Sequence, residues 1–459
     1  MEEEMNRFDC ISPGDYRYWD KKIAFYLSEN GSTKYKLRVE AALVRILYRR
    51  GLCSESIARE IASACSIVTT AEIYEEESRI KHDIRALVNC IKDKVSDEAK
   101  PFVHLAATSF DIIDTANAMR YKDFVEQVFL PALIKLESAL IDITRRYANI
   151  EQIGRTHGQH AEPITFGFTM AEYVSRLGGC IVEIQNRVSN LVGQFSGAVG
   201  AYNASSLLFD DSEEFETEVL AELGLEPASH STQIVQPEPL LRLLFEVIAT
   251  LGVLANLNDD MRNLQRSEIG EVGEAVSSGQ VGSSTMPHKR NPIGLENGKS
   301  MWKQVMPRII TVLMDQISEH QRDLTNSASG KTYPEIFAYT FYAAKRLTGI
   351  MEKLVVDEEN LKRNLGSAQD SIAEPLYIIL ASLGHPDAHE KIRVLTLEAR
   401  KKQKSLLIEI AEKDAELKPY FARMTDRQKE IISGKSKYTG IAAQKAKKVA
   451  NEWALRFGI

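Results

Sequence analysis

Long stretches of the chain place apolar residues three or four positions apart, which is the spacing of an amphipathic α-helix. The repeat is most regular between residues 102 and 350. Its three clearest runs are Leu133, Leu136, Leu140 and Ile143; Met170, Val174, Leu177, Ile181, Ile184, Val188 and Leu191; and Leu240, Leu244, Val247, Leu251 and Leu254. Such runs predict several long helices that pack against one another at small crossing angles.

Two sequence features bear on how these helices begin and pack. Pro131 precedes the first run and is expected near the first position of its helix, because proline has no N–H to leave unsatisfied there. Gly178 and Gly179 lie inside the second run, where each costs roughly 1 kcal/mol relative to alanine. This pair predicts either the close approach of a neighbouring helix or a kink.

The helical pattern changes twice along the chain and predicts three domains. Residues 1–101 mix short helical patterns with charged turns, and residues 102–350 carry the long runs. Residues 351–459 return to shorter helices with more lysine and with breaks at Gly366, residues 384–386 and Gly434. The predicted fold class is therefore all-α, with a central long-helix bundle between two smaller helical domains.

Composition limits the classes of partner. The chain has 459 residues, 44% of them hydrophobic, and can bury a sizeable core. Its formal net charge of -7 gives no electrostatic support for binding nucleic acid or an anionic membrane surface, so small-molecule partners are favoured. The most apolar window, residues 240–257, contains Arg242, Glu246 and Asn256 and is interpreted as a buried helix rather than a membrane span.

Two further features favour a cytoplasmic location. The five cysteines are scattered, odd in number and without metal-ligand spacing, as expected of a reduced protein without disulfides. The amino terminus is acidic and lacks the apolar run of a signal peptide.

A polar stretch at residues 278–292 has the composition of a catalytic loop. It combines two glycines, several hydroxyl side chains, Lys289 and Asn291 between two helical regions. Glycine lets the backbone approach a ligand closely, and a lysine supplies positive charge for a carboxylate. Glycine and serine alone would equally fit a surface turn.

Three other polar clusters interrupt the helical pattern. The first contains His104, Thr108 and Ser109, the second contains His157 and His160, and the third ends at Gln233. Structural interpretations also exist: Thr108 or Ser109 as a helix N-cap, His157 as a core histidine with its hydrogen bonds satisfied, and Gln233 as a loop residue. His157 and His160 lack a third zinc ligand, so no metal is expected.

Two pairs of residues near the amino terminus can likewise be interpreted either as ligand contacts or as structural residues. Arg17 and Tyr18 are suited to holding a phosphate, although a structural turn also explains them. His82 and Asp83 follow an acidic run and are either ligand contacts or the first residues of a helix.

The string from Ser283 to Pro292, with Met286-Pro287 and Lys289-x-Asn291-Pro292, resembles the signature of the fumarase/aspartase superfamily. Within it, residues 108–115 and 154–161 with Arg17-Tyr18 most resemble the adenylosuccinate lyases. The resemblance covers nearly the whole chain. It implies a cytoplasmic, cofactor-independent enzyme of purine biosynthesis that eliminates fumarate from adenylosuccinate and from the succinylaminoimidazole-carboxamide ribotide. It also implies a homotetramer in which three subunits build each active site.

The resemblance assigns roles residue by residue. Ser283 matches the general base and His157 the general acid, Glu296 matches the carboxylate that orients the acid, and Lys289 is the cation of the site. The residues matching substrate-binding positions are Arg17, Tyr18, His82, Asp83, His104, Thr108, Ser109, Gln233, Asn291, Arg322, Ser327 and Lys331.

Two departures concern the nucleotide half of the substrate. Lys331 stands where the family usually has an arginine, and Pro237-Glu238 stands where it often has Arg-Asp. The alternatives are therefore another superfamily enzyme, such as an argininosuccinate lyase or a carboxymuconate cycloisomerase, and a non-catalytic structural relative.

Overall fold

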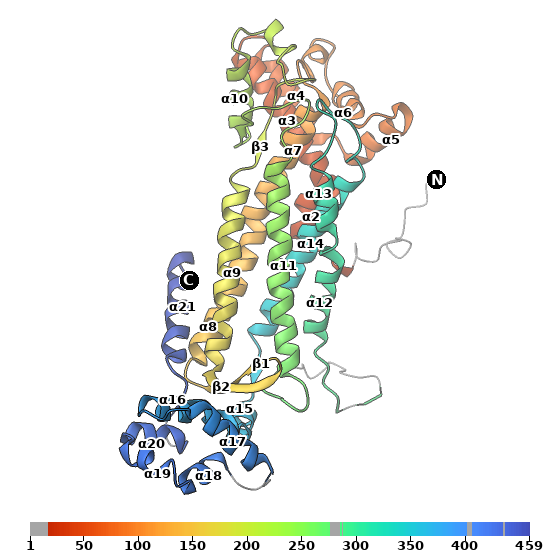
Figure 1. Cartoon of the computed structure of the whole chain (residues 1–459). Coiled ribbons are helices and arrows are strands. Elements are labelled where there is room, and N and C mark those ends of the chain that lie inside the picture. Colours follow the sequence, from red (N-terminus) through yellow and green to blue (C-terminus); the bar gives the residue numbers. More distant parts are fainter. Residues whose placement is uncertain (1–16, 276–284, 287, 402–405, 435–436) are drawn as a thin grey trace. The chain divides into compact units, whose positions relative to one another are not determined.

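The computed structural model describes residues 17–275, 285–286, 288–401, 406–434 and 437–459, without the side chain of residue 369. These residues form helices joined by short loops and three two-stranded sheets (Figure 1). The all-α fold class is confirmed. The strands are β1 (Glu151–Thr156), β2 (Gln159–Thr165), β3 (Val192–Gly193), β4 (Glu226–Pro227), β5 (Val272–Gly273) and β6 (Val355–Val356).

The chain divides into two compact units. Unit 1 comprises the described parts of Met1–Lys135, Gly179–Ala255 and Asn297–Arg346, and unit 2 those of Leu136–Gly178, Asn256–Glu296 and Leu347–Ile459. The boundaries fall inside five long helices: α8 (Leu130–Arg146), α9 (Phe166–Val188), α11 (Glu238–Leu264), α12 (Ile293–Val305) and α14 (Tyr333–Met351). The three domains predicted from chain order stay a prediction.

The described part of unit 1 also contains helical elements outside these five long helices. They are α2 (Lys21–Leu27), α3 (Glu29–Arg49), α4 (Glu55–Ile67), α5 (Thr70–Ile80), α6 (Asp83–Lys92), η1 (Lys100–Phe102), α7 (Ser109–Phe124), η2 (Val125–Phe129), η3 (Ser205–Leu207), α10 (Ser212–Glu222), α13 (Arg308–Met314) and η4 (Ser329–Thr332). Several begin at an N-cap side chain that accepts a backbone hydrogen bond, as Ser28, Ser54 and Thr69 do for α3, α4 and α5.

Unit 2 contains the β1–β2 hairpin and further helical elements, several of which share a core of their own. These are α15 (Glu358–Ser367), η5 (Gln369–Ile372), α16 (Ala373–Ser382), α17 (Ala388–Lys401), α18 (Leu407–Lys413), α19 (Lys418–Arg423), α20 (Asp426–Ile432) and α21 (Ala442–Phe457). Leu376, Leu380, Ile392 and Leu417 are among the buried residues of that core.

The long helices pack through the positions that the sequence pattern indicated. Every residue of the three apolar runs except Leu240 is buried. In unit 2, Tyr173 of α9 donates to Asp260 of α11 and Arg176 donates to Asn256 at 2.8 Å. The later residue of α9, Arg176, contacts the earlier residue of α11, Asn256. The two helices are therefore antiparallel neighbours (Figure 1).

Pro131 lies in a different setting from the predicted helix start. Helix α7, the π-helical turn η2 and α8 follow one another without a break, and Pro131 is the second residue of α8. A proline inside a helix cannot donate its backbone hydrogen bond, and a π-turn just before it accommodates that loss. The run is therefore the second part of a longer helix.

Gly178 shows the predicted close approach. A Cβ at this position would lie 2.5 Å from the indole ring of Trp453 in α21, whereas Gly179 has open space around its Cα. The cost of Gly178 within α9 is thus offset by the packing of an aromatic ring against the helix backbone.

Helix α11 is long and apolar enough to cross a membrane by length and composition. More than half of its most apolar window, 56%, is buried inside the chain, as in the core helix of a bundle. It also carries Thr250 and Asn258 as buried polar side chains. Composition alone therefore does not mark α11 as a membrane helix.

Glu137, in α8, is a buried carboxyl group with no compensating partner. Both of its oxygens are inaccessible, and no described residue donates a hydrogen bond to them. Burial alone raises the pKa of Glu137 from 4.5 to about 9. The folded protein therefore holds this carboxyl protonated, whereas the unfolded chain ionises it above pH 4.5.

We expect Glu137→Gln to stabilise the protein increasingly as pH rises. The wild type binds one more proton when folded, so it loses about 1.4 kcal/mol of stability per pH unit between the two pKa values, or about 4 kcal/mol from pH 5 to pH 8. Glutamine keeps the shape and removes this dependence. Melting temperatures across that range test it, with Glu359→Gln, an exposed change in α15, as control. An equal shift at pH 5 and pH 8 would contradict the buried, protonated carboxyl.

Candidate active site

His157 lies at the tip of a β-hairpin in unit 2. Strands β1 and β2 pair antiparallel, and Thr156 is opposite Gln159, so the turn consists of His157 and Gly158 alone. Both have positive φ, 53° and 73°, which is the pattern of a type I′ turn. His157 is exposed. Its interpretation as a core histidine is therefore wrong, and its imidazole is presented to solvent on a two-residue turn.

The strand leading to His157 contains an irregularity. The pairing register shifts between Ile153 and Arg155, and a Cβ on Gly154 would lie 2.7 Å from the carbonyl oxygen of Glu162. Glycine is needed at this position because the facing strand approaches so closely. The motif Gly154-Arg155-Thr156-His157 thus encodes a bulge followed by a tight turn.

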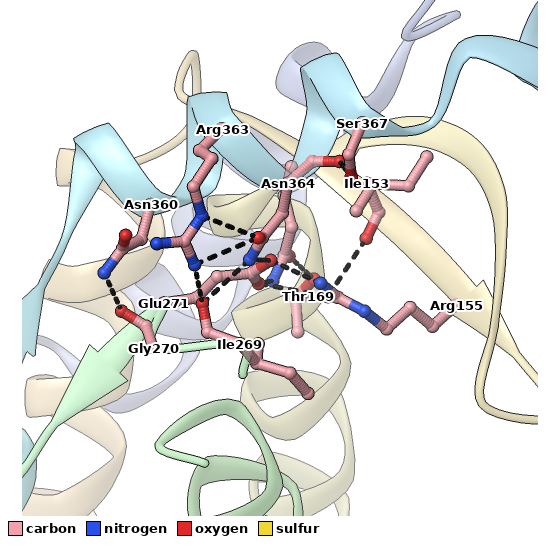
Figure 2. A network of polar contacts seen from close by, with 11 residues as sticks. Ile153, Arg155, Thr169, Ile269, Gly270, Glu271, Asn360, Arg363, Asn364 and Ser367 are labelled. Atoms are coloured by element: carbon pink, nitrogen blue, oxygen red, sulfur yellow. Dashed lines mark hydrogen bonds and ion pairs between the residues drawn. The ribbon is translucent and has the colours of Figure 1, made fainter. Parts of the chain in front are cut away.

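The side chain of Arg155 points away from the tip and binds a buried carboxylate. Its guanidinium contacts both oxygens of Glu271, at 2.6 and 3.1 Å (Figure 2). Glu271 is completely buried, just before β5. Nothing in the sequence singled out Glu271, since an acid in a mainly polar segment carries no signal that it is buried.

The predicted catalytic stretch is described only in part. Ser283 lies outside the described residues. Lys289 is exposed, Asn291 is partly buried, and Glu296 is exposed in the first turn of α12. His157, Lys289, Asn291 and Glu296 all belong to unit 2.

Glu274 fixes the start of α12, directly after this stretch. Its carboxylate accepts hydrogen bonds from the backbone N–H groups of Gly294 at 3.1 Å and Leu295 at 2.7 Å. Gly294 leaves room for it, because a Cβ there would lie 3.2 Å from the carboxylate. Negative charge at a helix N-terminus is stabilising. Gln265 also links Glu274 to this stretch: its side chain accepts a hydrogen bond from the N–H of Glu274 and donates one to the carbonyl of Arg290.

In unit 1, Thr108 and Ser109 form the amino-terminal end of α7. Thr108 is the N-cap, as one structural interpretation proposed, and its N–H donates to Asp111 at 2.8 Å. Asp111 is buried, also accepts from the N–H of Gly197, and has its pKa raised by burial to about 7. Ala106, before the cap, has a φ of 65°. Strained backbone of this kind concentrates at functional sites.

His104 is held beside the same turn. Its Nδ1 lies 2.6 Å from a carboxylate oxygen of Glu40 in α3, and its φ is 63°. Burial disfavours the charged imidazole, but the Glu40 carboxylate outweighs burial and raises the pKa of His104. Glu40 is buried, and no sequence pattern singled it out.

Three sequence-distant segments meet around the start of α7. The backbone N–H of Gln233 donates to the carbonyl of Gln321 at 3.3 Å, and the guanidinium of Arg322 lies over the ring of Phe110, 4.0 Å from its centroid. Asp114 accepts from the N–H of Val235 at 3.0 Å. Unit 1 therefore brings the predicted residues Thr108, Ser109, Gln233 and Arg322 into one cluster.

Arg322 and Asp114 give this cluster its electrostatic character. The Nε of Arg322 is buried, and no described residue accepts a hydrogen bond from it. Burial lowers the pKa of Arg322, and Asp114 partly offsets this effect. Burial also raises the pKa of Asp114 to about 7. A guanidinium with an unused buried donor is suited to binding an anionic ligand group.

The remaining predicted residues lie at helix ends and in loops of unit 1. Tyr18 accepts from Asn297 at 3.2 Å and packs against Tyr339 and Tyr342. Arg17, Ser327 and Lys331 are exposed.

His82 is the N-cap of α6, and its Nδ1 accepts from the N–H of Arg85 at 3.2 Å. Asp83 is the first residue of that helix and lies 3.6 Å from Lys36. The helix-start interpretation of this pair is confirmed, and the exposed imidazole leaves its other nitrogen accessible. Among the described residues, no group of three or more histidine, cysteine or acidic side chains could hold a metal ion.

Comparison with known proteins establishes the family. A family model described as Lyase matches residues 16–307, and one described as Adenylosuccinate lyase C-terminal matches residues 318–426. The fold matches that of the crystal structure of 3-carboxy-cis,cis-muconate lactonizing enzyme from Pseudomonas putida, with a TM-score of 0.85 and 26% identity, covering 97% of this chain and 99% of that one. The chain is thus a lyase of the fumarase/aspartase class.

Two relatives define its place within the class. The chain is 36% identical to "Adenylosuccinate lyase" of Pyrococcus horikoshii, over 96% of this chain and 97% of that protein. It is 29% identical to "N-acetyl-S-(2-succino)cysteine lyase" of Enterococcus italicus, over 91% of each. With the C-terminal family match, the chain belongs to the adenylosuccinate lyase family.

Proposed function

We propose that this protein cleaves adenylosuccinate to fumarate and AMP, and performs the equivalent cleavage of the succinylaminoimidazole-carboxamide ribotide in purine biosynthesis. The observation that carries the proposal is the cluster in unit 1, where Thr108, Gln233 and Arg322 come together around the start of α7. A helix N-terminus with hydroxyls suits a carboxylate, and a guanidinium suits a phosphate.

The difficult step is removal of a proton beside a carboxylate. Losing this weakly acidic proton leaves a dianion, so stabilising that charge is the main task of the site. Lys289 and Asn291 supply the cation and the amide that would grip the carboxylates. Ser283, as the proposed base, takes the proton. The carbon–hydrogen electron pair then forms the double bond of fumarate as the carbon–nitrogen bond breaks.

The departing nitrogen needs a proton, and His157 is the proposed donor. An imidazole is suited to transferring protons near neutral pH. The type I′ turn supports this role because it presents the imidazole on a short, defined support. Glu296 is the proposed carboxylate that orients the imidazole.

The nucleotide half of the substrate would be held in unit 1. Arg322 has a buried donor with no acceptor among the described residues, which supports its assignment to the phosphate. Ser327 and Lys331 would complete that grip, with Lys331 contributing a point charge rather than a guanidinium fork. Tyr18 and His82 would make further contacts.

We further propose a cytoplasmic homotetramer whose subunits share active sites. Two features support sharing: His157 and Lys289 are exposed in the single chain, and an apolar stripe on α13 and its flanking residues is uncovered. The stripe consists of Met306, Ile310, Leu313, Met314 and Ile317, which are 41 to 76% exposed. Apolar stripes of this kind mark surfaces for association, and a second copy of the chain is the proposed partner.

A substrate panel tests the function. We expect the purified enzyme to release fumarate from adenylosuccinate with a kcat/KM at least about a hundredfold above that for argininosuccinate or N-acetyl-S-(2-succino)cysteine, because a site built to bind polar substrate groups rejects analogues that leave those groups unpaired. Fumarate release measured by one coupled assay for all three compounds makes the comparison direct. A preference for either non-purine compound would identify another reaction of the superfamily, and no release from any would indicate a non-catalytic relative.

A further inference from the structure

The ion pair between Arg155 and Glu271 is buried and bidentate. The Arg155 side chain is 17% exposed and the Glu271 side chain is fully buried. Removing two charges from water is costly, and the cost is recovered only when geometry is good and the remaining lone pairs are satisfied. Both conditions hold in this pair.

Two amides satisfy the rest of the Glu271 carboxylate. Gln152 donates to Oε2 at 2.7 Å and Asn364 donates to Oε1 at 2.8 Å. With the two contacts from Arg155, this carboxylate accepts four hydrogen bonds. Gln152 is in turn fixed by the hydroxyl of Thr169, which donates to its Oε1 at 2.6 Å. Every polar atom of this carboxylate is therefore engaged.

The network joins four separate stretches of unit 2 (Figure 2). Gln152 and Arg155 belong to β1, Thr169 to α9, Asn364 to α15, and Glu271 to the segment after α11. From α15, Asn364 and Arg363 both donate to the carbonyl of Ile269, at 2.9 and 3.0 Å. Glu271 is therefore fixed from two sides and offers a rigid anchor to Arg155.

Arg155 connects this anchor to the hairpin tip. It is two residues before His157, on the tip side of the Gly154 irregularity, and it pairs with His160 across the hairpin. His157 is itself in the left-handed region, which costs a non-glycine residue of order 1 kcal/mol and persists only where the surroundings determine it. Several polar contacts described for β1 reach outside the hairpin. Of these, the two hydrogen bonds from the Arg155 guanidinium to Glu271 lie nearest the turn.

We propose that Glu271, acting through Arg155, is a positioning residue that sets the orientation of the His157 turn. The inference rests on the proposed function for its kinetic consequence. Neither residue reacts with the substrate. Their role is to hold the His157 turn in place, so that the imidazole keeps a fixed orientation toward the departing nitrogen.

A double-mutant cycle with His157 tests this role. We expect Glu271→Gln to lower kcat on adenylosuccinate about tenfold with less than a twofold change in KM, because small misplacements of a catalytic group cost one to two orders of magnitude. In a His157→Asn background the same change should lower kcat less than twofold, since the group that it positions is already absent. An equal loss in both backgrounds would overturn the proposal.

Two further variants complete the cycle. Arg155→Lys keeps the charge and removes only the planar fork, so it should show the same dependence on the His157 background even if Glu271→Gln does not fold. Glu390→Gln is the matched control: it breaks the exposed bidentate pair of Glu390 with Arg393 in α17 and should change kcat less than twofold in either background.

Hydrogen exchange separates this inference from the proposed function. Without substrate, Glu271→Gln should speed amide exchange in the peptide covering residues 150–166 at least about fivefold, while Glu390→Gln leaves it unchanged. If the wild type does not cleave adenylosuccinate, the proposed function fails, whereas faster exchange still supports the anchoring of the hairpin. Unchanged exchange in both Glu271→Gln and Arg155→Lys would overturn the anchoring.

Discussion

Replacing His157 with asparagine is expected to lower kcat on adenylosuccinate at least about a hundredfold while leaving the fold and assembly intact. Asparagine adopts positive φ more readily than most residues, so the two-residue turn should persist. What it removes is a group that can donate a proton, and general acid catalysis of this kind contributes about a hundredfold or more. Steady-state kinetics with purified protein and a circular dichroism melt measure both parts.

His160→Asn provides the matched control. His160 is exposed on β2 of the same hairpin, opposite Arg155, and no catalytic role is proposed for it. The same chemical change there should alter kcat less than about threefold, as expected of an exposed side chain outside the site. Comparable losses for both substitutions, or near-normal turnover in His157→Asn, would remove His157 from the role of acid.

Ser283→Ala is expected to cause a loss of similar size, at least about a hundredfold in kcat, by removing the proposed base. A serine hydroxyl is a poor base unless it is activated, and Lys289 is the cation that the chain offers for that purpose. Ser300→Ala, an exposed change in α12, is the control and should leave kcat within about twofold. Retention of most activity in Ser283→Ala would assign the base to another group.

Mixing the two inactive variants tests whether subunits share sites. If Ser283 and His157 of one site come from different chains, a hybrid of Ser283→Ala and His157→Asn contains some sites with both native residues, and part of the activity returns. Labelled subunits verify that exchange occurred. Verified exchange without any recovery would contradict sharing.

The helical scaffold could be predicted from the sequence because the buried face of a long helix requires an apolar residue every three or four positions. Val174 and Leu177, for example, are fully buried along α9 as their spacing indicated. A close approach was one of the two alternatives predicted for Gly178 and Gly179, and it is found at Gly178, although the sequence did not identify Trp453 as the partner. Pro131 was misplaced because a π-turn has no sequence signature that distinguishes it from a helix start.

The site was predictable as a set of residue types, but not as a set of contacts. Thr108, Gln233 and Arg322 carried recognisable motifs, and unit 1 does bring them together. The hairpin beneath His157 was not foreseen, because two short strands in a helical chain offer too few residues for a period-two pattern. Glu271 was missed for a related reason: its importance depends on Gln152 and Asn364, which only the fold brings to it.

The most direct measurement is a product analysis by proton NMR of wild-type enzyme and His157→Asn, each incubated with adenylosuccinate. We expect the wild type to convert the substrate to fumarate and AMP in equal amounts, and His157→Asn to form both products at least about a hundredfold more slowly. Absence of fumarate with the folded wild-type protein, or equal rates for the two proteins, would contradict it.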